Sequence, residues 1–303
     1  MIMKLLVLHG GDSPEKDISE LSAENICKAA AEAGYEVSKY NPVNGDEGLA
    51  SAVRAADLVI IAMHGVGAED GVIQGKLEAL NAKFLGSDSA VSALTFDKVK
   101  THELLESHGI TMPKYCVVSA SNFDDCELTR SKFVMKPINN GSSLDTVVVR
   151  QERDKEKLEQ CRKLLTKYKT MLVEQLIVGS EVTVPVLGKK ALPPILAIPP
   201  EGSEFDYENK YNGLSQEIVP IPDSMLSIDK QRELEELALR VHHLTGCKHL
   251  SRTDIMLDKD LKPFVLEINT LPGMTKESFY PKSARAVGFS MPQLVHEFVR
   301  LVE

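Results

Sequence analysis

Two acidic side chains, Asp254 and Glu267, face each other across a predicted β-hairpin in the last third of the sequence. Side chains alternate along a strand, so Arg252 shares a face with Asp254, and Asn269 shares one with Glu267. Directly opposed side chains have Cβ atoms about 4.5–5.5 Å apart, and two carboxylates at that distance repel unless a cation lies between them. Oxygen ligands of this kind suit Mg²⁺. The hairpin therefore predicts a metal site, and a solvated polar face is the alternative.

The register of this hairpin depends on the position of its turn. Residues 258–260 are turn-forming types, and we place the centre of the turn between Asp260 and Leu261. This placement predicts the opposed pairs Met256–Val265, Asp254–Glu267 and Arg252–Asn269. The second strand leads into a turn at 270–275 and then to Ser278, whose hydroxyl is suited to bind a small polar substrate.

A lysine followed by a glycine-serine loop, Lys136–Ser143, comes directly after the predicted strand Phe133–Met135. Backbone N–H groups of such a loop can bind phosphate oxygens, and the lysine supplies a positive charge. The P-loop pattern GxxxxGK[ST] occurs nowhere in the sequence. The segment predicts a phosphate site of another kind, or an ordinary hairpin turn.

A third glycine-rich segment, His64–Gly71, follows the apolar run Asp57–Met63. Open α/β sheets bind ligands at the carboxyl ends of their parallel strands. The glycine spacing differs from the dinucleotide-binding fingerprint GxGxxG. His64 is therefore a candidate ligand-binding residue, and a structural histidine in a turn-rich loop is the alternative.

The first third of the sequence alternates strands and helices. Apolar runs at Lys4–Leu8 and Asp57–Met63 are typical of buried parallel strands. A helix is expected to begin at Ser13–Glu15, with Ser13 as its N-cap and proline at the first helical position. Alternating β and α elements favour an open parallel sheet.

The remaining two thirds show an α+β pattern with short strands. The polar loop 200–213 is long enough to be a lid. We expect an α/β and α+β protein with an N-terminal α/β substrate-binding domain at 1–95, a small central domain at 96–178 and a C-terminal domain at 179–303.

The overall charge is acidic, with 35 Lys and Arg against 44 Asp and Glu and a net charge of −9. This balance argues against nucleic acid and anionic membranes as partners.

No apolar run reaches the roughly 18 residues of a membrane span, and the first apolar stretch runs into His9 without a signal-peptide cleavage site. The five cysteines are odd in number and form no CxxC pair, so neither a disulfide framework nor a zinc site is expected. These features predict a soluble, reduced, cytoplasmic protein.

In their order along the chain, the motifs resemble those of the D-alanine–D-alanine ligases of the ATP-grasp superfamily. The resemblance covers essentially the whole chain and rests on the ordered set rather than on one motif. The matching segments are His9–Gly11, Ser13–Glu15, Ile18–Ser19, His64–Gly65, Glu69–Gly71, Gln74–Gly75, Gly86–Ser87, Asp97–Lys98, Lys136–Pro137, Gly141–Ser143, Glu174, Glu181, Phe205–Glu208, Lys210–Tyr211, Arg252, Asp254, Glu267–Thr275 and Ser278.

The resemblance implies an N-terminal open parallel-sheet domain followed by a two-part ATP-grasp fold that clamps ATP. It implies a cytoplasmic homodimer that joins two D-alanine molecules for peptidoglycan synthesis, by way of an acyl phosphate and with release of ADP and phosphate. Mg²⁺ is the implied cofactor, as two ions, with Mn²⁺ as a possible substitute.

The resemblance also implies roles for individual residues. The ATP-binding residues would be Lys98, Lys136, Glu174, Glu181 and Lys210. The three lysines would hold phosphates, and Glu174 and Glu181 would bind the adenosine, Glu181 at the ribose. The metal ligands would be Asp254, Glu267 and Asn269. The groups that bind and join the two D-alanines would be Glu15, His64, Ser142, Tyr211, Arg252, Gly273 and Ser278.

Within that set, Glu15 would bind the ammonium group of the first D-alanine and form a triad with Ser142 and Tyr211. His64 would lie near the first substrate. Arg252 and the Gly273 amide would stabilise the oxyanion, and Ser278 would bind the carboxylate of the second D-alanine.

Two departures from the family pattern bear on substrate choice and on the phosphate loop. Ala68 stands where members usually have glycine, and Leu144-Asp145 stands where they usually have Val-Gly. Tyr211 indicates a D-alanine acceptor rather than D-lactate. A ligase with a different D-amino or D-hydroxy acid acceptor is the main alternative, and a nucleotide-binding protein without catalysis is the second.

Overall fold

The structure, a computed structural model, describes residues 2–141, 144–152, 154–198 and 216–303. Its first sheet is parallel, with strands β1 (Lys4–Leu8), β2 (Glu36–Tyr40), β3 (Leu58–Ile61) and β4 (Phe84–Leu85) in the order β2-β1-β3-β4. The apolar residues of β1 and β3 are buried because helices cover this sheet, as is usual for parallel strands. The predicted open parallel sheet is confirmed.

The helices of this part begin with α1 (Lys16–Glu32) and continue with the short 3-10 helix η1 (Pro42–Asn44) and with α2 (Asp46–Arg54), α3 (Val72–Ala79) and α4 (Ser89–Phe96). The prediction that Ser13 caps α1 was wrong, because Glu15 occupies the N-cap position. The Ser13 hydroxyl accepts from the Glu15 N–H at 3.2 Å and donates to the backbone oxygen of His64 at 2.7 Å. The N-terminal end of α1 is thereby tied to the loop after β3.

The middle part contains helices α5 (Lys98–Ser107) and α6 (Lys155–Lys167) and an antiparallel sheet in the order β5-β8-β6-β7. Its strands are β5 (Tyr115–Val118), β6 (Phe133–Pro137), β7 (Val147–Val149) and β8 (Met171–Gln175). Two 3-10 helices, η2 (Phe123–Asp125) and η3 (Glu127–Arg130), lie between β5 and β6.

A disulfide bond joins Cys116 and Cys126, which corrects the expectation of a fully reduced chain. The two cysteines are 10 positions apart. The pairing arises because the chain through η2 turns back toward β5, and the count and spacing of cysteines do not reveal that turn.

The last part is built on a second antiparallel sheet in the order β12-β11-β9-β13-β14, with β10 also paired to β9. The strands are β9 (Gly179–Leu187), β10 (Lys190–Ala191), β11 (Ile195–Ile198), β12 (Gln216–Ile218), β13 (Leu250–Asp258) and β14 (Pro263–Asn269). The helices are α8 (Ile228–Leu244), α9 (Phe279–Ala286) and α10 (Met291–Val302). The predicted lid, 200–213, lies outside the described residues.

The β13–β14 hairpin has the predicted register at its functional end. Arg252 lies opposite Asn269, and Asp254 lies opposite Glu267. An irregularity between Asp254 and Ile255 shifts the ladder by one residue, so Met256 lies opposite Phe264. The predicted pair Met256–Val265 was therefore wrong, because a bulge changes the count of residues on one strand relative to the other.

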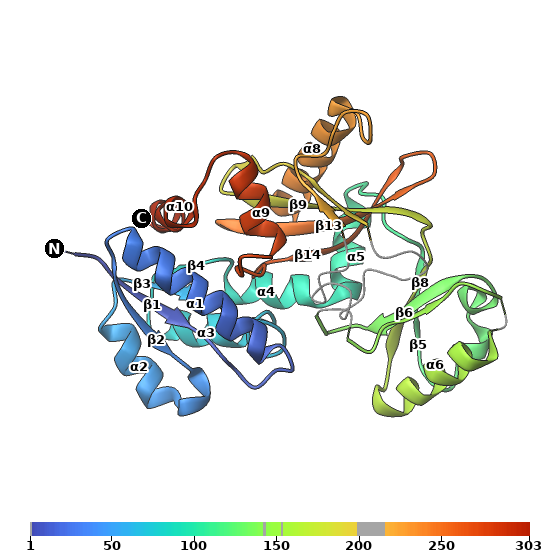
Figure 1. Ribbon diagram of the computed structural model, residues 1–303. Helices are drawn as coiled ribbons and strands as arrows, with labels where there is room; N and C mark the ends of the chain where they lie inside the picture. The colour runs from blue at the N-terminus through green and yellow to red at the C-terminus, as the bar shows by residue number, and fades with distance from the viewer. Residues whose placement is uncertain (1, 142–143, 153, 199–215) are drawn as a thin grey trace.

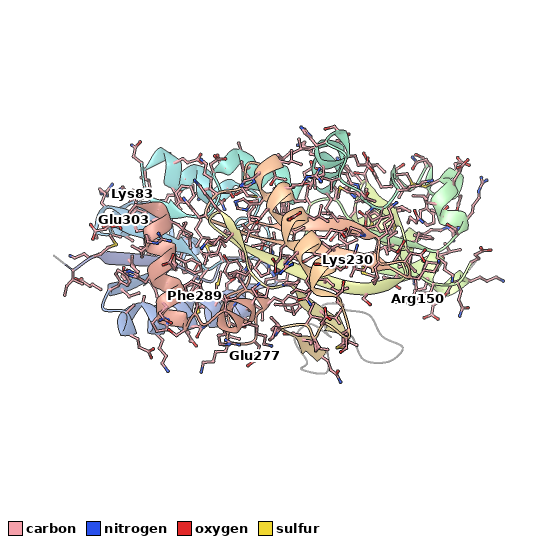
Figure 2. The ribbon with its side chains drawn as sticks, turned by 90° about the horizontal axis from the view of Figure 1, so that it is seen from above. Lys83, Arg150, Lys230, Glu277, Phe289 and Glu303 are labelled. Atoms are coloured by element: carbon pink, nitrogen blue, oxygen red, sulfur yellow. A yellow bond between two sulfur atoms is a disulfide. The ribbon has the colours of Figure 1, made fainter. Side chains whose placement is uncertain are left out.

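The molecule is elongated, with the parallel sheet and the β5–β8 sheet at opposite ends and the β9–β13–β14 sheet between them (Figure 1). Seen from above, Lys83 and Glu303 lie toward one end and Arg150 toward the other (Figure 2). The three sheets follow the predicted order, and the domain boundaries after residues 95 and 178 stay a prediction. Among the described residues, no helix combines the length and apolar character needed to span a bilayer.

The C-terminal helices share a core with the N-terminal sheet. Tyr280 of α9 and Phe298 of α10 are fully buried in the same apolar cluster as Leu5 and Val7 of β1. The Tyr280 hydroxyl donates to the backbone oxygen of Val186 on β9 at 2.8 Å. The two ends of the chain therefore fix the placement of the parallel sheet against the C-terminal sheet.

Phe298→Ala should lower the free energy of unfolding by about 3–5 kcal/mol, because it removes a fully buried aromatic side chain and leaves a cavity. Urea unfolding measures the change. Val287→Ala, at a side chain that is 51% exposed, is the control and should change stability by less than about 0.5 kcal/mol. Equal effects of the two substitutions would contradict the shared core.

Candidate functional site

A cavity of about 940 Å³ lies where the three parts of the chain meet. Its walls come from α1, the loop after β3, the start of α5, the loop after β6, the end of the β13–β14 hairpin and the turn before α9. The predicted site residues that line it are Glu15, His64, Lys98, Arg252, Glu267, Asn269, Gly273 and Ser278.

Arg252 and Asp254 form a bidentate ion pair on one face of β13. The Arg252 Nε and Nη2 atoms donate to the two carboxylate oxygens of Asp254 at 2.9 and 2.7 Å. Thr183 on β9 donates to the same carboxylate at 2.5 Å. Asp254 is only 4% exposed, so this pairing compensates a buried charge and also fixes the direction of the guanidinium group.

Glu267 and Asn269 of β14 lie at the cavity wall. The Glu267 carboxylate is 3.8 Å from Lys98 Nζ, and the Asn269 side-chain oxygen accepts from the Leu271 N–H at 2.8 Å. Among the described residues, no group of three His, Cys, Asp or Glu side chains is arranged to hold a metal ion. The candidate set is two opposed carboxylates and one amide, and this all-oxygen set fits a hard cation such as Mg²⁺.

Lys98 connects the hairpin to the phosphate-loop candidate. It is the first residue of α5, and its ammonium group donates to the backbone oxygen of Asn140 at 2.5 Å. Burial lowers the pKa of Lys98, and the nearby Glu267 carboxylate opposes that effect. A buried cation near the loop after β6 is suited to bind an anionic group there.

Glu174 of β8 is buried and holds Lys136 in place. Its carboxylate accepts from Lys136 Nζ at 2.7 Å and from His102 Nε2 at 2.7 Å. Burial raises the pKa of the Glu174 carboxyl, but the interactions with Lys136 and His102 outweigh it and the pKa lies below the ordinary value. The observed contacts of Glu174 are thus with protein groups, and its predicted contact with adenosine stays a prediction.

His102 was missed in the sequence. It lies four residues after Lys98 on α5, so the two side chains occupy the same helix face. The four-residue spacing places His102 beside Lys98, but it does not show that Glu174 of β8 lies next to that helix face. Only the fold brings Glu174 within 2.7 Å of His102.

Glu15 lies where two glycine-containing loops approach each other. It is 5% exposed, and a Cβ built on Gly65 would lie 2.5 Å from its carboxylate. Gly65 also has a φ of +76°. Its left-handed backbone conformation and the lack of room for a Cβ atom therefore both require glycine there. A Cβ on Gly141 would lie 3.2 Å from the same carboxylate. The Glu15 carboxylate therefore lies beside the phosphate-loop candidate.

His64 bridges α1 and the turn that follows β14. Its Nε2 lies 3.2 Å from Ser22 Oγ, and its Nδ1 lies 3.1 Å from the backbone oxygen of Leu271. Glu69 is 3.6 Å from Nδ1. The imidazole is 6% exposed and lies at the cavity wall, so its ring is held in place by both parts of the chain.

The turn before α9 brings Gly273 close to Ser278. A Cβ on Gly273 would lie 2.8 Å from Ser278 Oγ, which accepts from the Thr275 N–H at 3.0 Å. The guanidinium carbon of Arg252 lies 5.8 Å from the ring centre of Phe279. A backbone N–H, a hydroxyl and a guanidinium group thus surround one end of the cavity.

Glu181, the residue predicted at the ribose, is half-buried on β9, opposite Met256 of β13. Three other predicted residues, Ser142, Lys210 and Tyr211, lie outside the described residues.

Asp145, one of the departures from the family pattern, has a φ of +56°. Its carboxylate accepts from Lys167 Nζ and from the Tyr168 hydroxyl, each at 2.6 Å. Its charge is therefore paired with α6 and the residue that follows it.

Comparison with known proteins decides the family. Residues 104–300 match the family model described as the D-alanine–D-alanine ligase C-terminus. The D-alanine–D-alanine ligase of Nitratidesulfovibrio vulgaris (strain Hildenborough) is 37% identical over 302 residues, which cover 99% of this chain and 98% of that protein. The chain belongs to the D-alanine–D-alanine ligase family.

Other members of the ligase family agree over the full length. The D-alanine–D-alanine ligase of Desulforudis audaxviator is 35% identical, with 100% of this chain and 99% of that protein covered. The crystal structure of the Bacillus anthracis ligase complexed with ATP matches with a TM-score of 0.83 at 26% identity, covering 99% of this chain and 97% of that one. The expected ATP-grasp arrangement is confirmed.

The ionised Glu174 of this ligase-family chain should make its stability depend on pH. Its pKa lies below the ordinary 4.5, so its contribution is fully present above pH 4.5 and is lost as pH falls through the lowered pKa. Glu174→Gln should therefore be less stable than wild type at neutral pH, and the gap should shrink in acid. Thermal midpoints measured down to about pH 3 test this.

Glu32→Gln is the control, because the Glu32 side chain is 53% exposed and its pair with Lys28 is at the surface. It should differ little from wild type at any pH. A gap for Glu174→Gln that stays constant across the acid range would contradict the assigned ion pair.

Proposed function

We propose that the protein joins two D-alanine molecules into D-alanyl-D-alanine and converts ATP to ADP and phosphate. The observation that carries this proposal is that Glu15, Lys98, Arg252, Glu267 and Ser278 line one and the same cavity. These groups come from segments far apart in the sequence, and family membership supports the same reaction.

The reaction needs activation because a carboxylate is a poor electrophile. An oxygen of the first D-alanine carboxylate attacks the γ-phosphorus of ATP, and ADP leaves. The amine of the second D-alanine then attacks the acyl carbon, and inorganic phosphate leaves with the oxygen that linked it to that carbon. Negative charge develops in both steps, so fixed cations and N–H donors lower both barriers.

The donor side of the site is assigned to Glu15 and His64. The Glu15 carboxylate, buried beside Gly141, would accept the ammonium group of the first D-alanine. His64, held by Ser22 and Leu271, would lie near the same substrate. Ser142 and Tyr211 would complete a triad with Glu15.

The acceptor side is assigned to the turn before α9. Ser278 would bind the carboxylate of the second D-alanine. The Gly273 N–H and Arg252 would stabilise the oxyanion of the tetrahedral intermediate, and the Asp254 carboxylate already orients the guanidinium group for that task. Donors fixed before the reaction need no reorganisation as charge develops.

The nucleotide side is assigned to Lys98 and Lys136 as phosphate-binding residues, with Lys210, and to Glu181 at the ribose. Glu174 would bind the adenosine and would also hold Lys136 in place through their 2.7 Å ion pair. Burial of Lys98 supports this assignment, because a desolvated ammonium group interacts strongly with phosphate oxygens.

The Mg²⁺ ligands would be Asp254, Glu267 and Asn269. When bound, the metal ion offsets the negative charge of the phosphate groups during phosphate transfer. Two ions, with Mn²⁺ as a substitute, remain part of the proposal, as do the cytoplasmic location and a homodimer formed through the N-terminal part.

The direct test is incubation of the purified protein with ATP, Mg²⁺ and D-alanine, with phosphate and dipeptide measured together. Equal amounts of both products are expected. Replacing the acceptor with other D-amino acids or D-hydroxy acids should lower the yield. Phosphate release without dipeptide, or preference for another acceptor, would contradict the proposal.

Glu267→Gln should reduce turnover by about 100-fold or more and raise the Mg²⁺ concentration needed for half-maximal rate. The fold should persist, because the Glu267 side chain is 32% exposed and its ion pair with Lys98 is long, at 3.8 Å. Asp260→Asn, at an exposed side chain in the turn of the same hairpin, is the matched control and should keep full activity. Near-normal rates for Glu267→Gln would refute the metal role.

A further inference from the structure

Side chains of α1 hold both backbone groups of Met274, the residue that follows Gly273. The Met274 N–H donates to Ser22 Oγ at 3.2 Å, and the Met274 backbone oxygen accepts from Asn25 Nδ2 at 2.7 Å. Ser22 is fully buried, and Asn25 is half-buried at the cavity wall. The two residues lie three positions apart on one face of α1.

The other side of Gly273 is held from the same direction. His64, which contacts Ser22, also lies 3.1 Å from the backbone oxygen of Leu271. The backbone is thus fixed two residues before Gly273 and one residue after it. Glycine has the widest conformational freedom of any residue, so the direction of its N–H depends on these neighbouring contacts.

We propose that Asn25 is a positioning residue that holds the Gly273 N–H toward the reacting carboxyl group through its hydrogen bond to Met274. This inference rests on the proposed function. Helix α1 follows directly on Glu15, which is assigned to the donor ammonium group, so the same helix sets the spacing between the donor substrate and the oxyanion-binding N–H. Asn25 acts through Met274 and not on the substrate.

Asn25→Asp gives the sharpest test because it keeps the shape of the side chain and removes the N–H donor. A carboxylate beside a carbonyl oxygen repels it, whereas a protonated carboxyl group can donate to it. We expect kcat to fall by about tenfold to a hundredfold at neutral pH, as for other small misplacements of reacting groups, with the KM for ATP unchanged. Relative to wild type, kcat should recover as the pH is lowered and the introduced carboxyl group is protonated.

Asn25→Ala should lose kcat at every pH, because it has no group that can donate to Met274. Asn122→Asp introduces the same substitution at an exposed asparagine in the middle part of the chain and should match wild type. Thermal midpoints of all variants show whether the fold persists. A merely structural role of Asn25 would lower stability without a pH-dependent recovery that is specific to Asn25→Asp.

The inference is overturned if Asn25→Asp keeps the wild-type kcat, if its relative kcat does not rise in acid, or if its KM for ATP rises in parallel with the loss. With an active wild type, these outcomes leave the proposed ligation intact. A wild-type protein that forms no dipeptide would overturn the proposed function first, and this inference with it.

Discussion

The arrangement of the site depends on the antiparallel pairing of β13 and β14. That ladder places Asp254 opposite Glu267 and Arg252 opposite Asn269, so two carboxylates must share a small, largely buried region. The structure compensates them with Arg252 on one side and Lys98 on the other. Cations placed for this electrostatic reason are also suited to stabilise the charge that develops when phosphate is transferred.

The β13–β14 hairpin shows which features of the site the sequence pattern predicts and which it does not. Alternation along the strands was enough to predict the opposition of Asp254 and Glu267, because both lie near a recognisable turn. It failed at Met256, since a one-residue irregularity leaves no mark in the sequence. Similarly, Ser13 has the right residue type for an N-cap, but α1 begins two residues later, with Glu15 at the N-cap position. The Ser13 hydroxyl accepts from the Glu15 N–H and also donates to the backbone oxygen of His64, a contact that only the fold creates.

Contacts between distant segments were the hardest to foresee. Asn25 and Met274 are 249 positions apart, and nothing in the local sequence of either indicates that they meet. They meet because α9 and α10 complete the core of the N-terminal sheet. An acidic chain of net charge −9 can still be suited to a polyanionic nucleotide, because the cations at the cavity wall include the buried Lys98 and the partly buried Arg252.

The central claim is that the carboxylate of one D-alanine is phosphorylated before the second amine attacks it. D-Alanine carrying ¹⁸O in both carboxylate oxygens tests this directly, with mass spectrometry of the released phosphate. The acyl phosphate route predicts one ¹⁸O atom in each phosphate, because the oxygen that joins carbon to phosphorus leaves with the phosphate. Phosphate free of ¹⁸O, formed together with dipeptide, would contradict the account.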